Sequence, residues 1–349
     1  MALSPLKRPR AVIFGCAGLE LTPSEDRFFQ TVNPVGFILF KRNCQTPDQV
    51  RQLVAALRAC VRRPDAPVLI DQEGGRVQRL GPPQWPALPA GAVFAECAAR
   101  HGMETATSAA RLHGRLLAAD LAPLGITVDC APVLDVLRPE THDVIGDRAF
   151  GETPEMVARL GRAVGEGLLD GGVLPVIKHI PGHGRASVDS HKELPEIDAA
   201  TAELAASDFV PFQALSDLPW AMTAHVVYRS IDAQAPASTS RKVIRKIVRG
   251  VIGFGGLLIS DDIGMQALSG SMEERARACL ATGCDIVLHC SGDLAEMQEV
   301  NEGLKPLRQI AESWLEKSDA LRLARQLTGP VDVAALCAER DQLLAGATS

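Results

Sequence analysis

Aromatic residues are scarce in this sequence, at 4% of 349 residues with a single tyrosine. Proteins that bind single-stranded nucleic acid stack bases on aromatic side chains, so this scarcity argues against that class. A basic excess is missing as well, because 36 Lys and Arg face 42 Asp and Glu, which gives a net charge of −6. No overall positive field attracts nucleic acid or an anionic membrane, and we expect neither as a partner.

Long apolar runs are also missing, since no stretch approaches the roughly 18 apolar residues that cross a bilayer. The opening "LKRPRAVIFGCAG" loosely resembles a signal peptide, but its apolar part ends at Glu20 after about eight residues and suits a buried strand. The nine cysteines are an odd number and include no CxxC pair, which favours reduced thiols over disulfides or a zinc ribbon. We therefore expect a cytoplasmic protein.

What the sequence does contain is an alternation of short apolar runs with longer amphipathic segments. Helix-length segments cover 47–62, 105–120, 153–170, 200–215, 240–252 and 271–282. Near-continuous apolar strands that alternate with helices indicate a parallel sheet buried on both faces, and eight such units favour a (β/α)₈ barrel. The eight candidate strands are 11–18, 36–40, 67–72, 126–136, 173–179, 220–228, 256–261 and 284–289.

The domain organisation follows from the same alternation. A doubly wound sheet is the competing fold, but "GCAGLE" after the first strand matches its GxGxxG turn poorly. No Ser/Gly-rich linker or low-complexity tract divides the chain. We expect one α/β domain over 1–349, in which approximately 293–349 supply the last barrel helix and a C-terminal helical extension.

Polar side chains gather where the candidate strands end. The C-terminal ends of barrel strands carry the chemistry in this fold, so these side chains are expected to share one rim. Such a rim suits a ligand rich in hydroxyl groups, which carboxylates and guanidinium groups hold well. The side chains are Asp71, Glu73, Arg76, Arg79, Asp143, Asp147, Arg148, Lys178, His179, His225, Asp261 and Asp262.

Each of these residues also has a purely structural interpretation. A lone aspartate at a strand end is commonly a helix cap or an ion-pair partner. Glu73 and Arg76 could pair with each other, His225 could be a hydrogen-bonded core histidine, and Asp262 could pair with an arginine. The gathering of many such groups at one end of the sheet is what favours a functional site.

The stretch "VIKHIPGHGRASVDSH", residues 176–191, allows three chemistries. His179 and His183 are spaced as on a zinc-binding helix, but the prolines and glycines around them break a helix, so we expect no metal. A phosphate loop is weakly supported, because no GxxxxGK[ST] motif is present. Asp189 and His191 are two residues apart, which in an extended segment places both side chains on one side as an acid/base pair.

Taken in order, five segments resemble the successive motifs of glycoside hydrolase family 3, and most closely its bacterial β-N-acetylglucosaminidase branch, which acts in peptidoglycan recycling. The resemblance extends from about residue 11 to residue 292, and the block from Lys178 to His191 is its most specific part. The segments are "DQEGGRVQRL", "DVIGDRAFG", "KHIPGHGRASVDSHKELP", "AMTAHVVY" and "LLISDDIGM".

The resemblance implies a role for each matching residue. Asp261 matches the nucleophile of a retaining hydrolysis, and Asp189 with His191 matches the acid/base dyad of this branch. Related β-glucosidases often have Trp where this chain has Asp262 and take their acid from another domain. The residues that match sugar-holding positions are Asp71, Arg79, Arg148, Lys178 and His179.

The resemblance further implies an exo-acting enzyme that removes terminal N-acetylglucosamine from a small carbohydrate or muropeptide, without a cofactor, and we expect it to act as a monomer. Another family 3 β-glycosidase, a glycoside phosphorylase, a metal-dependent barrel hydrolase and a non-catalytic sugar-binding protein are the alternatives. The residues alone do not specify the aglycone, which is the group released when the glycosidic bond is cleaved.

Overall fold

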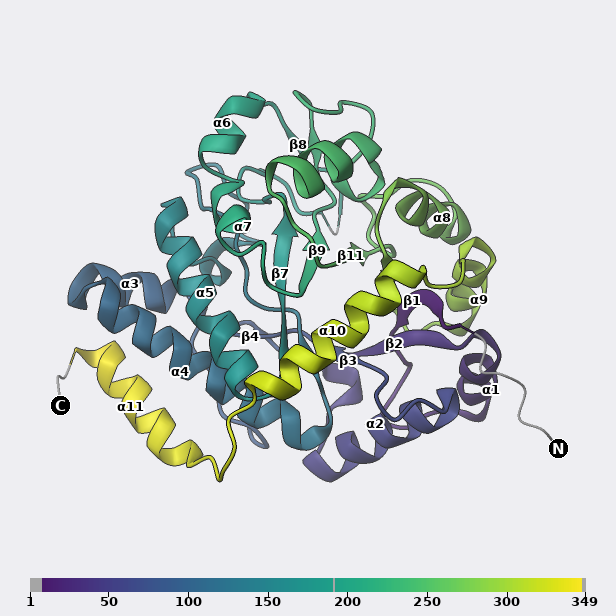
Figure 1. Cartoon of the computed structure of the whole chain (residues 1–349), viewed down its shortest axis with the longest axis horizontal. Coiled ribbons are helices and arrows are strands. Elements are labelled where there is room, and N and C mark those ends of the chain that lie inside the picture. Colours follow the sequence, from purple (N-terminus) through teal and green to yellow (C-terminus); the bar gives the residue numbers. More distant parts are fainter. Residues whose placement is uncertain (1–7, 191, 347–349) are drawn as a thin grey trace.

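The computed structural model describes residues 8–190 and 192–346. Its centre is a closed barrel of eight parallel strands, in the order β1-β2-β3-β6-β7-β9-β11-β12 and back to β1, surrounded by helices (Figure 1). This confirms the predicted (β/α)₈ barrel. The barrel strands are β1 Arg10–Phe14, β2 Pro34–Leu39, β3 Val68–Ile70, β6 Val128–Asp129, β7 Leu174–Ile180, β9 Trp220–Thr223, β11 Leu257–Asp262 and β12 Ile286–His289.

Each of the eight predicted apolar runs overlaps one barrel strand, and two of the runs extend five or more residues beyond their strand. In the run 126–136 only β6 is regular, because Pro132 has no N–H to give to a neighbouring strand. The run 220–228 divides into β9 and the separate β10 (Val227–Tyr228), which pairs with β8 (Glu196–Ile197) in a small sheet outside the barrel. A second small sheet, β4 (Gln72–Gly74) with β5 (Val77–Gln78), follows β3.

The helices lie outside the barrel, and their apolar sides cover it. The helix α1 begins with a reciprocal cap, in which Glu25 N donates to Thr22 Oγ1 at 3.2 Å and Thr22 N donates to Glu25 Oε2 at 3.0 Å. The helices up to the eighth strand are α1 Pro23–Val32, α2 Pro47–Val61, α3 Gly91–His101, α4 Met103–Leu121, α5 Pro154–Asp170, α6 Thr201–Ala206, α7 Val210–Ala214 and α8 Met272–Thr282.

Two helical predictions differ from the structure in detail. The segment 200–215 forms two short helices, since Asp208 between them turns inward to pair with Arg185 and Pro211 starts a new helix. The segment 240–252 forms a wide π-helix over Val243–Val251 instead of a regular α-helix.

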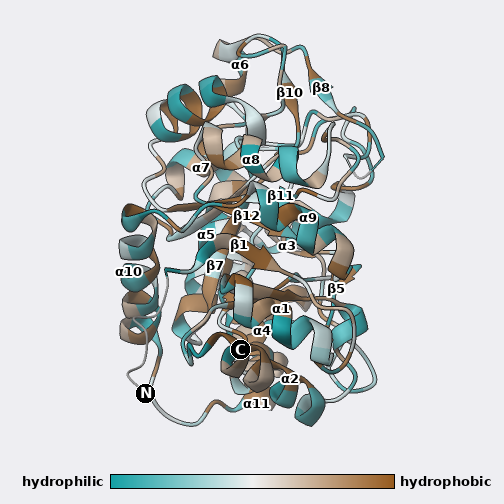
Figure 2. Cartoon of the chain, turned by 90° about the vertical axis from the view of Figure 1, so that its right-hand side faces the viewer, coloured by the Kyte–Doolittle hydropathy of each residue, from teal (hydrophilic) through white to brown (hydrophobic). Residues whose placement is uncertain are grey.

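Three helices follow the last strand: α9 Leu294–Gly303, α10 Gln309–Arg325 and α11 Val333–Ala345. The helix α10 lies across the barrel at the N-terminal ends of the strands, where Arg308 pairs with Asp285 just before β12 (Figures 1 and 2). The helix α11 packs Leu336 against Leu112 and Leu116 of α4. None of the described helices is long and apolar enough to span a membrane.

The core fills the barrel and the layer between strands and helices, and in Figure 2 the central strands are largely hydrophobic. Side chains from β1, β2, β7 and β11 are almost wholly buried, as a parallel sheet covered on both faces requires. One end of the barrel is covered by α10, so the loops after the C-terminal strand ends are left to form a site.

Candidate active site

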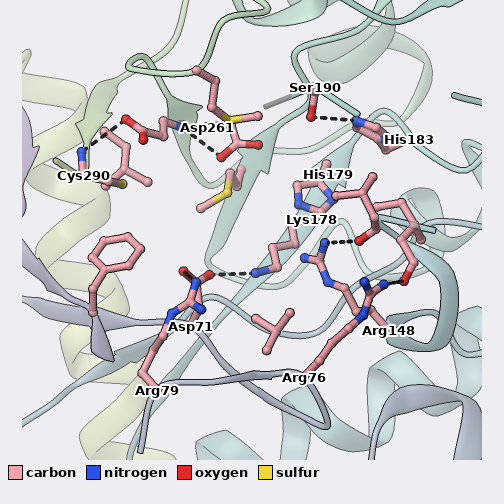
Figure 3. A pocket seen from close by; sticks show the side chains of 18 residues that line it. Asp71, Arg76, Arg79, Arg148, Lys178, His179, His183, Ser190, Asp261 and Cys290 are labelled. Carbon is pink, nitrogen blue, oxygen red and sulfur yellow. Dashed lines mark hydrogen bonds and ion pairs between the residues drawn. The ribbon is translucent and has the colours of Figure 1, made fainter. Parts of the chain in front are cut away.

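A pocket of about 300 Å³ opens at the C-terminal ends of the barrel strands (Figure 3). Loops after β2, β3, β6, β7, β11 and β12 contribute to it, so residues far apart in the sequence meet there. The lining residues are Phe40, Asp71, Arg76, Val77, Arg79, Val144, Ile145, Arg148, Lys178, His179, His183, Ser190, Met222, Asp261, Asp262, Met265, Leu288 and Cys290. Six of the eight residues proposed from the sequence are among them.

A buried network of ion pairs forms one wall of this pocket. Lys178 Nζ donates to Asp71 Oδ1 at 2.9 Å and lies 2.6 Å from Glu73 Oε1. Arg148 reaches the same Glu73 with two hydrogen bonds, from Nε at 2.8 Å and from Nη2 at 2.7 Å. Arg79 Nη2 donates to Asp71 Oδ2 at 3.0 Å. The network fixes planar, charged groups in an orientation that suits sugar hydroxyls.

Neighbouring groups of opposite charge keep the acidic and basic side chains of this network ionised. Burial alone would raise the pKa of Glu73, but Arg148 and Lys178 outweigh burial and lower it to about 2. The pKa of Asp71 is also lowered, because Lys178 and Arg79 outweigh its burial. Burial lowers the pKa of Lys178, yet Asp71 and Glu73 raise it overall. Both carboxylates and the ammonium group are therefore charged at neutral pH.

Glu73 is a site residue that the sequence reasoning did not propose. The alternative pairing of Glu73 with Arg76 is wrong, because Arg76 Nε instead donates to Asp147 Oδ1 at 2.7 Å on the exposed rim. Asp71 immediately precedes the short strand β4 and Glu73 lies within it, two residues later, so in this extended segment both carboxylates point to the same side. That spacing was the signal in the sequence that could have identified it.

His179 is held by Asp135, a second residue that the sequence reasoning missed. His179 Nδ1 lies 2.7 Å from Asp135 Oδ2, and His183 N donates to Asp135 Oδ1 at 2.7 Å. Burial would raise the pKa of Asp135, but His179 lowers it to about 2. The bond to Asp135 leaves Nε2 of His179 available for a ligand.

The loop after β7 returns to the pocket at Ser190. Gly184 in this loop packs closely against the backbone of Val136. A Cβ atom at position 184 would lie 1.9 Å from the Val136 carbonyl oxygen, so only glycine fits there. Ser190 Oγ lies 3.3 Å from His183 Nε2, and both side chains are buried. This contact holds the end of the loop, next to Asp189, against the pocket.

Asp189 lies beside the pocket, and its carbonyl oxygen accepts the N–H groups of Lys192 and Glu193 at 2.9 and 3.0 Å. His191, the second residue of the expected acid/base pair, lies outside the described residues. The acid/base role of this pair therefore stays a prediction.

Asp261 and Asp262 end the strand β11 at the opposite wall from the ion-pair network (Figure 3). Asp261 Oδ1 accepts the N–H of Asp262 at 2.8 Å. The Asp262 carboxylate accepts two further N–H groups, from Gly264 at 2.9 Å and Cys290 at 3.2 Å. Asp262 is therefore held by backbone groups, and the alternative of an arginine partner is wrong. Burial raises the pKa of Asp262.

His225 is a hydrogen-bonded core histidine, which was the structural interpretation of its position in the sequence. It is fully buried, its Nδ1 lies 2.5 Å from Ser238 Oγ, and its Nε2 lies 3.0 Å from the carbonyl oxygen of Asp262. It does not line the pocket, but it anchors the strand end that carries Asp261.

The described residues contain no group of three or more His, Cys, Asp or Glu side chains placed to hold a metal ion. His179 and His183, whose spacing raised the question, have ring centroids 5.7 Å apart and both contact Asp135. In the part of the chain that the structure describes, these contacts hold the loop after β7 in place.

Comparison with known proteins identifies relatives over nearly the whole chain. Residues 25–325 match the N-terminal domain of glycosyl hydrolase family 3. The beta-hexosaminidase of Alkalilimnicola ehrlichii is 41% identical over 297 residues, which cover 83% of this chain and 82% of that protein.

Solved structures agree with these relatives. The crystal structure of NagZ from Neisseria gonorrhoeae in complex with N-trifluoroacetyl-D-glucosamine is 34% identical with a TM-score of 0.85, over 99% of this chain and all of that one. The same enzyme in complex with zinc ion has a TM-score of 0.82 at 32% identity, over 99% of this chain and all of that one.

Proposed function

Because this chain belongs to glycosyl hydrolase family 3, we propose that its pocket performs a retaining hydrolysis with Asp261 as the nucleophile. The chain is a glycoside hydrolase of the β-N-acetylglucosaminidase type, as its beta-hexosaminidase and NagZ relatives establish. The observation that carries the proposal is the position of Asp261, which faces a wall of fixed cations and carboxylates across a pocket the size of one sugar ring.

The substrate side of the proposal rests on the ion-pair network. Asp71, Arg79, Arg148, Lys178 and His179 would hold the hydroxyl groups of a terminal N-acetylglucosamine. Their geometry is fixed before the sugar arrives, so little free energy is spent on ordering them. The barrel interior beneath the pocket is filled by packed side chains, so only the end of a sugar chain fits, which supports exo-action.

The first chemical step would form a bond between Asp261 and the anomeric carbon. The glycosidic C–O bond breaks as His191, protonated and oriented by Asp189, gives its proton to the leaving oxygen. The ionised Asp261 also stabilises the positive charge that develops on the ring. The product is a covalent glycosyl-enzyme and a released alcohol.

In the second step, neutral His191 would take a proton from water, and the water oxygen would attack the anomeric carbon. The Asp261–carbon bond then breaks, which restores the carboxylate and frees the sugar. A histidine with an ordinary pKa near 6.5 can serve as acid and then as base near neutral pH. Two displacements return the sugar with its original β configuration.

We extend the proposal to the biological setting. Muropeptides with a terminal N-acetylglucosamine are the proposed substrate class, since NagZ enzymes are among the similar structures. All nine cysteines are free thiols, which supports a cytoplasmic location. We also propose that the enzyme acts as a monomer.

The central experiment compares aryl N-acetyl-β-glucosaminide with aryl β-glucoside, and follows the released sugar by proton NMR. We expect kcat/KM to favour the N-acetylated substrate by at least about 100-fold, and the β anomer to appear first. Equal rates would contradict the sugar specificity, and first release of the α anomer would contradict the retaining mechanism. Formation of a sugar 1-phosphate in phosphate buffer would indicate a phosphorylase instead.

A further inference from the structure

A second cleft lies on the outer wall of the barrel, between the π-helix, the end of α8 and the start of α10. Its volume is about 310 Å³. Four arginines, Arg241, Arg245, Arg249 and Arg308, line it, and none of its described lining residues carries a carboxylate. In a chain with a net charge of −6, this concentration of positive charge is unusual.

The spacing of three of these arginines along the chain places them on the same side of the helix. Along 241–248, exposed basic pairs alternate with buried apolar pairs, as in "RKVIRKIV". A π-helix makes hydrogen bonds from i to i+5, so its turn is wider than an α-helical turn and residues four apart stay on one side. Arg245 and Arg249 lie in the π-helix and Arg241 lies two residues before it, and the three arginines form a row beside the cleft.

Three of the four guanidinium groups are held in place. Arg249 donates to the carbonyl oxygens of Phe254 and Gly256 at 2.9 and 2.7 Å, and to Asp285 Oδ2 at 2.9 Å. Arg308 also donates to Asp285, so two cations share one buried carboxylate. Arg241 Nη2 donates to the Ala281 carbonyl oxygen at the end of α8, at 2.7 Å.

Arg245 differs from the other three, because among the described residues it has no hydrogen bond or ion pair. Its side chain is exposed at the mouth of the cleft. With four cations and one carboxylate, the cleft keeps a local excess of positive charge that no described group neutralises. Apolar walls from Ile244, Leu280, Ile310 and Trp314 lower the local dielectric and strengthen this field.

We propose that this cleft binds a small anion with two or more phosphate groups, held by Arg245 together with the fixed guanidinium groups of Arg241, Arg249 and Arg308. Guanidinium groups match phosphate oxygens with paired hydrogen bonds, and fixed ones lose little entropy on binding. The enclosed volume favours a small molecule over an extended polyanion.

The cleft is separate from the sugar pocket. Arg249 and Arg308 bind the residues that precede β11 and β12, whereas Asp261 lies near the other end of β11. Asp261 lies five residues beyond Gly256 along the strand, which corresponds to about 16 Å. An anion in the cleft is therefore expected to leave the KM for aryl substrates unchanged, whether or not the proposed function is correct.

The test is isothermal titration of the full chain with sodium pyrophosphate, with sodium chloride at matched ionic strength as the blank. We expect one saturable site with a Kd below about 1 mM, and at least a tenfold weaker Kd in Arg245→Gln. Lys246→Gln is the matched control, because it removes the same charge from an exposed neighbour that does not line the cleft.

Four results would overturn the proposal. The first is no heat beyond the sodium chloride blank, and the second is an unchanged Kd in Arg245→Gln. The third is an equal loss in Lys246→Gln, which would indicate diffuse attraction to the basic helix and no defined site. Binding of poly-glutamate without binding of pyrophosphate would likewise replace the small anion by an acidic protein segment.

Discussion

The ammonium nitrogen of Lys178 lies 2.6 Å from a carboxylate oxygen of Glu73, and both side chains are almost completely buried. The two residues are brought together from the end of β7 and from the β4–β5 hairpin. Because Glu73 also binds Arg148 with two hydrogen bonds, a single carboxylate contacts two buried cations. The alignment of the sugar-holding wall therefore depends on a residue that need not touch the sugar.

Replacement of Glu73 by glutamine tests this dependence. The amide keeps the shape but removes the charge, so Lys178 keeps only Asp71 as an ionised partner, and Arg148 loses the one carboxylate that it contacts among the described residues. We expect Glu73→Gln to lower the free energy of unfolding by about 3–5 kcal/mol, as loss of one partner of a buried ion pair does. Urea denaturation measures the change, and kcat/KM should fall with it.

The control for Glu73 is Asp147→Asn, which breaks the pair with Arg76 on the rim. Both of those side chains are nearly half exposed. An exposed pair contributes at most about 1 kcal/mol, so the control should remain close to the unaltered protein. A similar loss in both variants would show that Glu73 has no special place in the network.

The nucleophile is tested by Asp261→Ala beside Asp262→Asn. Loss of the attacking carboxylate should lower kcat for aryl N-acetyl-β-glucosaminide by about 10⁴-fold or more. Asparagine at 262 can still accept the N–H groups of Gly264 and Cys290, so a much smaller loss is expected there. If Asp262→Asn were the inactive variant and Asp261→Ala the active one, Asp262 would be the nucleophile.

The acid role of His191 predicts a dependence on the leaving group. An alkyl glycoside needs its oxygen protonated, whereas a dinitrophenyl glycoside leaves without help. His191→Ala should therefore lose about 10²–10⁴-fold on the alkyl substrate and far less on the aryl one. Lys192→Ala, whose side chain is 81% exposed, is the neighbouring control. Equal losses on both substrates would argue against the acid role.

The sequence predicted the barrel because its strands lie in short, near-continuous apolar runs, a pattern that is expected wherever a strand is buried on both faces. It also predicted which strand ends would meet, since parallel strands place their carboxyl ends on one rim. Six of the eight proposed site residues, including Asp71, Lys178 and Asp261, line one pocket. The strand preceding Pro132 was overestimated in length because its run was judged by apolar composition, whereas Pro132 cannot donate an N–H to a neighbouring strand.

The partners of the site residues were harder to predict than the residues themselves. Glu73 could have paired with Arg76, three residues away, or with Arg148, 75 residues away, and only the fold brings Arg148 near. Asp135 lies within an apolar run and carried no signal until the fold placed it beside His179. Long-range pairing depends on loop geometry, which spacing in one sequence does not encode.

Metal removal provides an independent test of the mechanism. The proposed steps use only Asp261, His191 and water, so prolonged treatment with a chelator should leave kcat unchanged within about twofold. Activity that falls with the chelator and returns with zinc would instead support a metal-dependent hydrolase. A chelator-treated sample of Asp261→Ala serves as the inactive reference.

Buried histidines predict that stability falls in mild acid. Burial lowers the pKa of His113 to about 4, and likewise that of His183. Above pH 6.5 neither the folded nor the unfolded chain protonates them, so they have no effect there. Between pH 6.5 and 4 only the unfolded chain binds these protons, so each histidine removes up to about 1.4 kcal/mol of stability per pH unit.

The variant His113→Gln isolates one of these contributions, because the amide can still donate to the Glu73 carbonyl oxygen that His113 Nε2 contacts at 3.1 Å. Urea unfolding at pH 7 and at pH 5 measures the free energy of unfolding of both proteins. We expect it to fall less in His113→Gln than in the unaltered protein between pH 7 and pH 5. Carboxylates such as Glu73 and Asp135, with pKa values of about 2, lose their stabilising effect only below about pH 4.5, so they do not disturb this comparison. A difference that is the same at both pH values would show that His113 titrates alike in the folded and unfolded chain.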